Sequence, residues 1–329
     1  MDAKKIIFGL IALLLALAVF FVINFSPKPQ KVNHPQNDQM QSINYDQSKG
    51  KLYYLEPKGN NLKSWDINKD QVETLIDFKS IAIDWVEYSP DNNYALAHHT
   101  NPENGVQTQT WLVDLTTKKI TKELPENISV VSWRSDSQKI AYQFSDFEGT
   151  ANDLVVSDPD GSNSQTITQL TEIYYQLYWV GSDKILYFPL TTELAPVNIS
   201  EININDKQIK YLAQNVYIGN DNKINDQTIL FQLSLAESNN FKLYKYTPND
   251  NKFTLLDDFA LARPAAIIDK DSFITPRIFK DKYSLVKFTG AKKKALKANL
   301  DKMQDISGLF YFNQAVYIAS DGSLYVFHE

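Results

Sequence analysis

The chain has 329 residues, of which 43% are hydrophobic and 12% aromatic, a composition typical of a folded protein with a sizeable core. Its formal net charge is −6 and it holds only three arginines, so we expect no nucleic-acid partner, because phosphate binding needs clustered cations. The lack of cysteine excludes disulfides, thiolate metal sites and a cysteine nucleophile.

Near the N-terminus, an uncharged apolar run extends over Ile6–Ile23, directly after Lys4 and Lys5. A helix of about 18 residues rises roughly 27 Å, close to the hydrocarbon thickness of a bilayer. The run therefore predicts a transmembrane signal anchor over 6–25, with residues 1–5 cytoplasmic and the rest of the chain outside the cytoplasm. A cleaved signal peptide is the alternative, since an Ala-x-Ala pattern occurs within the run.

Residues 26–41 are polar and include three prolines, which is typical of a linker. We expect the folded body of the protein to occupy 42–329.

A short motif recurs through this body about every 44 residues. Its clearest copies are YSPDNNYALAHH from Tyr88, WRSDSQKIAYQF from Trp133 and WVGSDKILYF from Trp179. The first apolar residues after the seven turns are Leu52, Tyr94, Ile140, Ile185, Ile229, Phe273 and Val316. Such regular spacing indicates a repeat architecture.

Each repeat contains short alternating runs rich in β-branched and aromatic residues. Ile140, Tyr142 and Phe144, for example, fall on one face of a predicted strand. Four short antiparallel strands in a repeat of this length form the blade of a β-propeller. We therefore predict an all-β propeller of seven four-stranded blades, with six or eight as alternatives.

The last repeat ends after three strands, so its outer strand has to come from elsewhere. The segment around Asn33 to Met40 is the candidate, although Pro35 gives it poor strand character. Within the repeat at Val131–Phe144, we expect Trp133 to be a packing residue of the first strand and Arg134 to begin a hairpin turn.

The repeats from Tyr88 to Gly161 resemble those of TolB-like, WD-type bacterial propellers, whose blades carry an aromatic-x-SPDG turn and a later D-x-DG turn. DLVVSDPDGSN matches the second turn, whereas the glycine of the first is absent after Asp91 and Asp136. The resemblance implies a propeller over about 285 residues and no particular activity.

Motifs for catalysis and metal binding are absent from the sequence. No G-x-S-x-G elbow occurs, so we expect no enzyme activity and no cofactor. Adjacent residues of a strand point to opposite faces, so His98 and His99 are not expected to share a metal. DPDGSN at 158–163 is interpreted as a hairpin turn, and Lys292–Lys294 as a solvated turn or a contact for an anionic partner.

The connections between second and third strands are long in four repeats and contain no lysine or arginine. They should lie together on one rim, where a rigid scaffold commonly binds its partners. The candidate binding residues on this rim are Glu103, Asp146, Glu148, Asp153, Glu193 and Glu237. Exposed carboxylates that merely keep the protein soluble are the alternative.

Together these features favour a membrane-anchored extracytoplasmic propeller that acts as a non-enzymatic protein-binding scaffold in the cell envelope. Its expected partner is an envelope protein or a cationic peptide segment. The alternatives are a sensor that binds carbohydrate or peptide, and a propeller enzyme of the lyase or glycosidase type.

Overall fold

The computed structural model describes residues 30–31, 40–56, 60–100, 108–146, 152–172, 174–191, 195–235, 240–269, 271–280, 282–296, 300, 306–320 and 323–328. The described residues contain strands and turns and no helix. None of these residues therefore forms a helix that could span a membrane. The predicted anchor over 6–25 lies outside the described residues.

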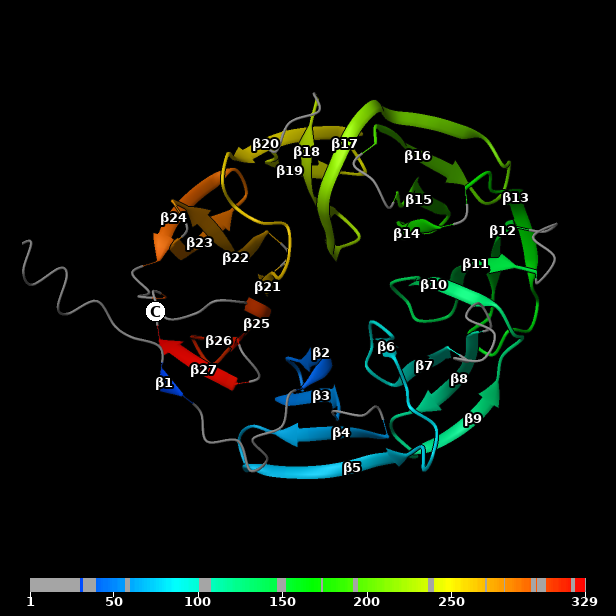
Figure 1. Cartoon of the computed structure of the whole chain (residues 1–329), viewed down its shortest axis with the longest axis horizontal. Helices are drawn as coiled ribbons and strands as arrows, with labels where there is room; N and C mark the ends of the chain where they lie inside the picture. The colour runs from blue at the N-terminus through cyan, green and yellow to red at the C-terminus, as the bar shows by residue number, and fades with distance from the viewer. Residues whose placement is uncertain are drawn as a thin grey trace, which may run out of the picture.

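The strands form sheets arranged in a ring around a central axis (Figure 1). The first three sheets each contain four consecutive antiparallel strands. Their strands are β2 (Gln41–Asp46), β3 (Lys51–Leu55), β4 (Asn61–Asp66) and β5 (Gln71–Asp77); β6 (Trp85–Tyr88), β7 (Tyr94–Thr100), β8 (Thr108–Asp114) and β9 (Lys119–Glu123); and β10 (Ile128–Trp133), β11 (Ile140–Ser145), β12 (Asn152–Ser157) and β13 (Gln165–Gln169).

The second half of the ring contains a seven-stranded sheet and two further four-stranded sheets. Their strands are β14 (Tyr175–Val180), β15 (Lys184–Pro189), β16 (Val197–Asn203), β17 (Ile209–Asn225), β18 (Thr228–Ser234), β19 (Lys242–Thr247) and β20 (Lys252–Asp257); β21 (Ala266–Asp269), β22 (Ser272–Phe279), β23 (Lys282–Thr289) and β24 (Lys292–Leu296); and β25 (Ile306–Phe312), β26 (Ala315–Ser320) and β27 (Ser323–His328), completed by β1 (Gln30–Lys31).

The long strand β17 explains the seven-stranded sheet. Its first part pairs with β16, as at Ile202↔Ile209, and its second part pairs with β18, as at Asn222↔Leu230. One strand thus serves as the outer strand of one group of four and the inner strand of the next, and it curves between the two positions in Figure 1.

The predicted second strands agree with the structure. The seven apolar residues that define the repeat all lie in the second strand of a group of four, in β3, β7, β11, β15, β18, β22 and β26. Trp133 is buried in β10, and Arg134 begins the turn to β11, as expected. The SPDG-like turns also form without glycine, since Asn92 and Ser137 adopt positive φ angles of 54° and 61°.

The last sheet obtains its outer strand from the N-terminal region. Gln30 pairs with Val326 and Lys31 pairs with Tyr325, both antiparallel. The closing strand found here therefore lies upstream of the expected segment around Asn33 to Met40, of which only Met40 is among the described residues. Lys292–Lys294, expected in a turn, form the start of β24 instead.

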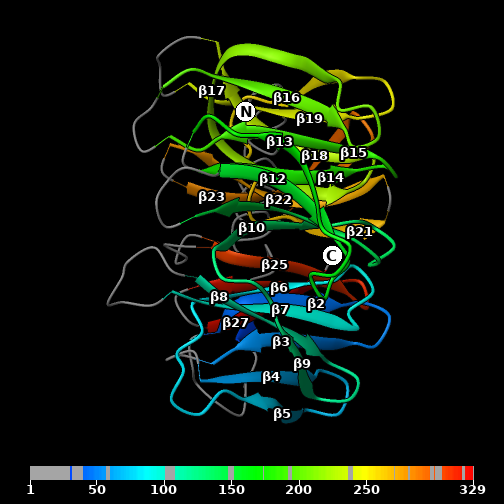
Figure 2. The same cartoon turned by 90° about the vertical axis from the view of Figure 1, so that its right-hand side faces the viewer.

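Apolar clusters fill the spaces between neighbouring sheets. Leu62 and Leu75 of the first sheet, for example, pack with Val86 and Ala97 of the second. The strands that contribute these side chains are seen from the side in Figure 2. The buried area therefore lies between sheets around the ring, which leaves the axis free for a cavity.

Aspartates at the strand ends hold many of the turns. The carboxylate of Asp46 accepts hydrogen bonds from the backbone N–H groups of Ser48 and Lys49 at 3.0 and 3.1 Å, and Asp66 and Asp114 repeat this geometry. Burial alone would raise the pKa of Asp46, but the hydrogen bonds from Ser48 and Lys49 and the charge of Lys49 outweigh it and hold this pKa below its usual value.

Replacing Asp46 tests this turn chemistry. Asp46→Ala should lower the free energy of unfolding by about 1–2 kcal/mol, because a charged acceptor of several hydrogen bonds is lost. A carboxyl group with a lowered pKa stabilises the fold above its unfolded-state pKa and loses this effect as the pH falls below about 4. The free energy of unfolding of Asp46→Asn should therefore fall less than that of the wild type as the pH is lowered through this range. Urea titrations at several pH values measure both effects, and identical pH profiles would contradict the assignment.

Candidate functional site

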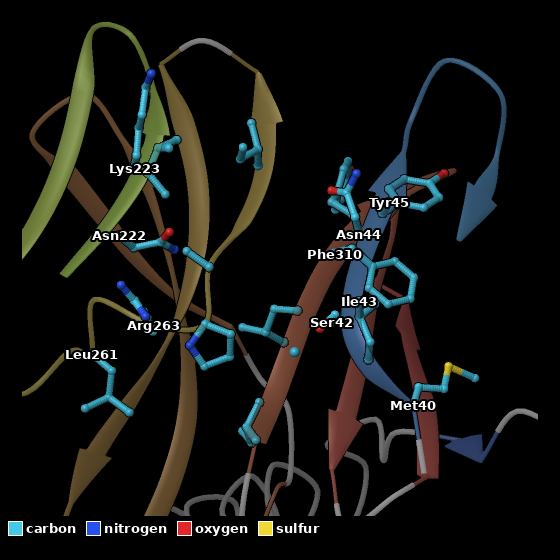
Figure 3. A pocket seen from close by; sticks show the side chains of 18 of the residues that line it. Met40, Ser42, Ile43, Asn44, Tyr45, Asn222, Lys223, Leu261, Arg263 and Phe310 are labelled. Atoms are coloured by element: carbon cyan, nitrogen blue, oxygen red, sulfur yellow. The ribbon is translucent and has the colours of Figure 1, made fainter. Parts of the chain in front are cut away.

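A cavity of about 1230 Å³ lies where the inner strands β2, β17, β21 and β25 approach one another. One wall is polar, with Asn220, Asn222 and Lys223 from β17 and Arg263 from the segment before β21. In Figure 3, Arg263, Asn222 and Lys223 lie on one side of the space, and Ser42, Asn44 and Tyr45 of β2 lie on the other. The cavity thus combines amide, hydroxyl and cationic groups from strands far apart in the sequence.

The guanidinium of Arg263 is held in a fixed position. Its Nε donates to the backbone oxygen of Asp221, and its Nη2 donates to Asp221 Oδ1 at 3.0 Å and to the Tyr178 hydroxyl at 3.3 Å. Tyr178 in turn donates to the same carboxylate oxygen. These contacts employ one side of the planar guanidinium, and Nη1 has no hydrogen-bond partner among the described residues.

Burial explains the electrostatics of this group. Tyr178 and Asp221 are buried, whereas the Arg263 side chain is 48% exposed and lines the cavity. Burial and then the carboxylate of Asp221 raise the pKa of Tyr178 well above its ordinary value, so the hydroxyl stays neutral and can donate. The guanidinium of Arg263 is therefore held in place, and its remaining N–H groups can donate hydrogen bonds to a carboxylate or carbonyl oxygen of a ligand.

Lys223 lines the cavity beside this group but is already engaged. Its Nζ donates to the backbone oxygen of Trp179 and pairs with Asp226 at 2.6 Å. Burial lowers the pKa of Lys223, against the opposing effect of Asp226. Of the two cations, Arg263 is therefore the better placed to contact a ligand.

The predicted acidic rim is only partly described. Asp146 directly follows β11, and Asp153 is the second residue of β12. Both are half-buried, and neither lines the cavity. The other four candidates, Glu103, Glu148, Glu193 and Glu237, lie outside the described residues. The grouping of the six carboxylates on one rim therefore stays a prediction.

The histidine pair behaves as a strand predicts. His98 is fully buried, stacks on Trp85 with ring centroids 4.6 Å apart, and its Nδ1 lies 2.9 Å from Thr110 Oγ1. His99 Nδ1 instead contacts the backbone oxygen of Ala82. Within the described part of the chain, no group of three histidine, cysteine or acidic residues is arranged to hold a metal ion.

Sequence reasoning missed Arg263. Its partners Tyr178 and Asp221 lie 85 and 42 positions away, so no local motif links the three. The sequence contains only three arginines, and this scarcity was the one feature that could have drawn attention to Arg263.

No protein-family model matches this sequence. No curated protein matches it either.

Solved structures do match the fold. A prolyl endopeptidase aligns with a TM-score of 0.65 at 10% identity, over 88% of this chain and 49% of that chain, so this chain spans about half the length of that enzyme. The β-propeller domain of the Trilobed protease from Pyrococcus furiosus aligns with a TM-score of 0.62 at 15% identity, over 88% and 94% of the two chains. TolB from Acinetobacter baumannii aligns with a TM-score of 0.51 at 11% identity, over 77% and 61%.

At these identities the likeness shows the fold alone. The part of the chain that the structure describes is all-β and has a TolB-like β-propeller fold, as the resemblance of its repeats implies.

The group around Arg263 can be tested by substitution. Asp221→Ala should lower the free energy of unfolding by about 3 kcal/mol, because it leaves the buried Tyr178 hydroxyl and part of the guanidinium without an acceptor. Tyr178→Phe should cost only about 1 kcal/mol, since Asp221 and Arg263 still pair. Urea denaturation measures both, and equal losses would show that the carboxylate is not the centre of the group.

Proposed function

We propose that this chain is a non-enzymatic binding propeller of seven blades, tethered outside the cytoplasmic membrane by residues 6–25, which holds a segment of another envelope protein in its central cavity. The blade number is supported by five four-stranded sheets and a seven-stranded sheet that shares β17 between two groups of four. The tether is supported by the apolar run Ile6–Ile23 that follows two lysines.

The observation that carries the binding proposal is the position of Arg263. A half-exposed guanidinium, oriented by two buried groups, offers directed N–H donors to the cavity. Because its partners already fix it, little side-chain entropy is lost when it binds an oxygen acceptor. Such a group suits a carboxylate side chain or a backbone carbonyl of a bound segment.

The rest of the lining suits an extended peptide. Backbone N–H and C=O groups of such a segment need acceptors and donors, and the amides of Gln41 and Asn222 can supply both. Asn44 Nδ2 already donates to Asn92 and Asn220 Oδ1 already accepts from the backbone N–H of Asp221, so Asn44 offers its carbonyl and Asn220 its NH₂ group. Apolar side chains of the segment have Leu261 and other aliphatic residues to contact. The volume of about 1230 Å³ exceeds the roughly 300–1,000 Å³ of typical small-molecule sites, which leaves room for a short peptide segment.

Carbohydrate is the second candidate ligand. Tyr283 and Tyr311 line the cavity together with the amides, and aromatic faces beside amide groups are suited to sugar rings and their hydroxyls. The experiment below distinguishes the two, since a sugar ligand would leave no captured protein.

Blocking the cavity tests the site. Asn222→Arg should place a long cation in the cavity and reduce capture of a protein partner from detergent-solubilised membranes at least about tenfold, a loss of about 1.4 kcal/mol. Asn205→Arg, in the exposed turn after β16, is the matched control and should capture normally. Quantitative mass spectrometry of the co-purified proteins is the readout, and the same partners at the same level in both variants would reject the cavity as the site.

The acidic rim is proposed as a second contact, for cationic residues of the same partner. Reversing four charges with Glu103→Lys, Asp146→Lys, Glu148→Lys and Glu193→Lys should weaken capture and reduce its dependence on salt concentration. An unchanged set of partners, captured with an unchanged salt dependence, would leave these carboxylates a role in solubility alone.

A further inference from the structure

One sheet of the ring has a charge opposite to that of the protein. Residues 266–296, which span β21 to β24, contain eight lysines and arginines and three aspartates, a net charge of +5 in a chain whose net charge is −6. The rest of the chain is therefore strongly acidic. A concentration of cations in one place in such a protein calls for a physical explanation.

Three of these lysines lie on one face of the sheet. Lys287 pairs directly with Lys294, and Thr289 pairs with Lys292, so Lys287, Lys292 and Lys294 share a face, called here the lysine face. The same face carries Leu285 and Leu296, which pack in a cluster with residues of β25 and β26. The lysine face is therefore turned toward the last sheet of the ring.

The arrangement has an electrostatic cost within the protein. Like charges directly opposite each other on two strands are destabilising, and Lys287 lies opposite Lys294. Lys287 itself is half-buried, lies over the Tyr311 ring at 5.9 Å and is attracted by Asp269, so its charge is partly compensated within the protein. Lys293, on the other face, pairs with Asp257 at 2.7 Å. Lys292 and Lys294 are exposed and make no ion pair with any residue that the structure describes. An anion outside the protein can therefore interact with Lys292 and Lys294, the two exposed members of the lysine face.

The chain path places this face close to the predicted membrane anchor. Strand β1, Gln30–Lys31, forms the outer edge of the last sheet, and β24 forms the outer edge of the sheet beside it (Figure 1). Only residues 26–29 separate the predicted anchor from β1, and four residues extend at most about 14 Å. This side of the ring is therefore held near the membrane surface.

We propose that the lysine face docks on the anionic phospholipid headgroups of the membrane that holds the anchor, and so sets the orientation of the propeller. The inference rests on the proposed tether. Each lysine close to an anionic surface strengthens association about fivefold, and the attraction decays within a Debye length of about 8 Å at physiological salt. Because the connection between the predicted anchor and β1 is short, it would keep these few lysines close enough to the membrane surface to bind it.

The absence of cysteine allows clean single-site labelling of the full chain. A fluorescent donor is attached at Ala295→Cys in β24, or at Thr117→Cys in the turn before β9 as a distant control, and the protein is reconstituted into nanodiscs with acceptor-labelled headgroups. In discs containing phosphatidylglycerol, energy transfer should be high at position 295 and low at position 117. In phosphatidylcholine discs, or at high salt, transfer at position 295 should fall.

Substitution of the lysines supplies the matched comparison. In the Lys292→Gln/Lys294→Gln variant, transfer from position 295 in anionic discs should fall to its value in neutral discs. Lys119→Gln/Lys122→Gln, which removes two exposed lysines from the outer strand β9, should leave it unchanged. Equal transfer for wild type and the Lys292→Gln/Lys294→Gln variant would overturn the proposal. So would aggregation of this variant with unchanged transfer, since the lysines would then only protect an edge strand.

Failure of the proposed tether can be told apart from failure of the lysine face. If residues 6–25 do not anchor the chain, the full chain does not co-purify with neutral discs. Sedimentation with phosphatidylglycerol vesicles then tests lipid binding by the lysine face alone. Wild type should partition at least about tenfold more strongly than Lys292→Gln/Lys294→Gln if the lysine face binds lipid. Equal partitioning would reject lipid binding by the lysine face independently of the tether.

Discussion

The packing of the first sheet against the last is the interaction on which the rest of the structure depends. Leu52, Tyr54 and Trp65 of the first sheet form one apolar cluster with Phe310 and residues of β26 and β27. The other sheets pack on neighbours close in sequence, whereas this cluster joins the two ends of the chain. The pairing of β1 with β27 adds backbone hydrogen bonds to the same closure, so both ends are tied into the ring.

Closure also creates the cavity. Its walls come from β2 near the start of the chain, from β17 and the Arg263 segment, and from β25 near the end, so an open ring would separate them. The group formed by Tyr178, Asp221 and Arg263 likewise joins β14 and β17, the inner strands of two successive groups of four, to the segment before β21. The packed ring therefore holds Tyr178 and Asp221 where they orient the Arg263 guanidinium toward the cavity, as directed binding requires.

The distribution of charge follows the same geometry. Most of the ring is acidic, while the sheet β21–β24, beside the sheet that β1 completes, is basic. The proposed partner segment and the proposed lipid contact therefore use different parts of the molecule, the central cavity and the outer strand β24. Binding at one need not obstruct the other.

The sequence alone determined the repeat, because alternating apolar residues and a recurrent turn are local properties, and all seven marker residues lie in the expected strands. It also predicted the burial of Trp133 and the separation of His98 from His99. Only the tertiary structure decided the rest. Gln30 and Lys31 close the ring despite a weak local strand pattern, β17 serves two groups of strands, and Arg263 meets partners up to 85 positions away. These features depend on which strands meet in space, and local periodicity carries no information about that.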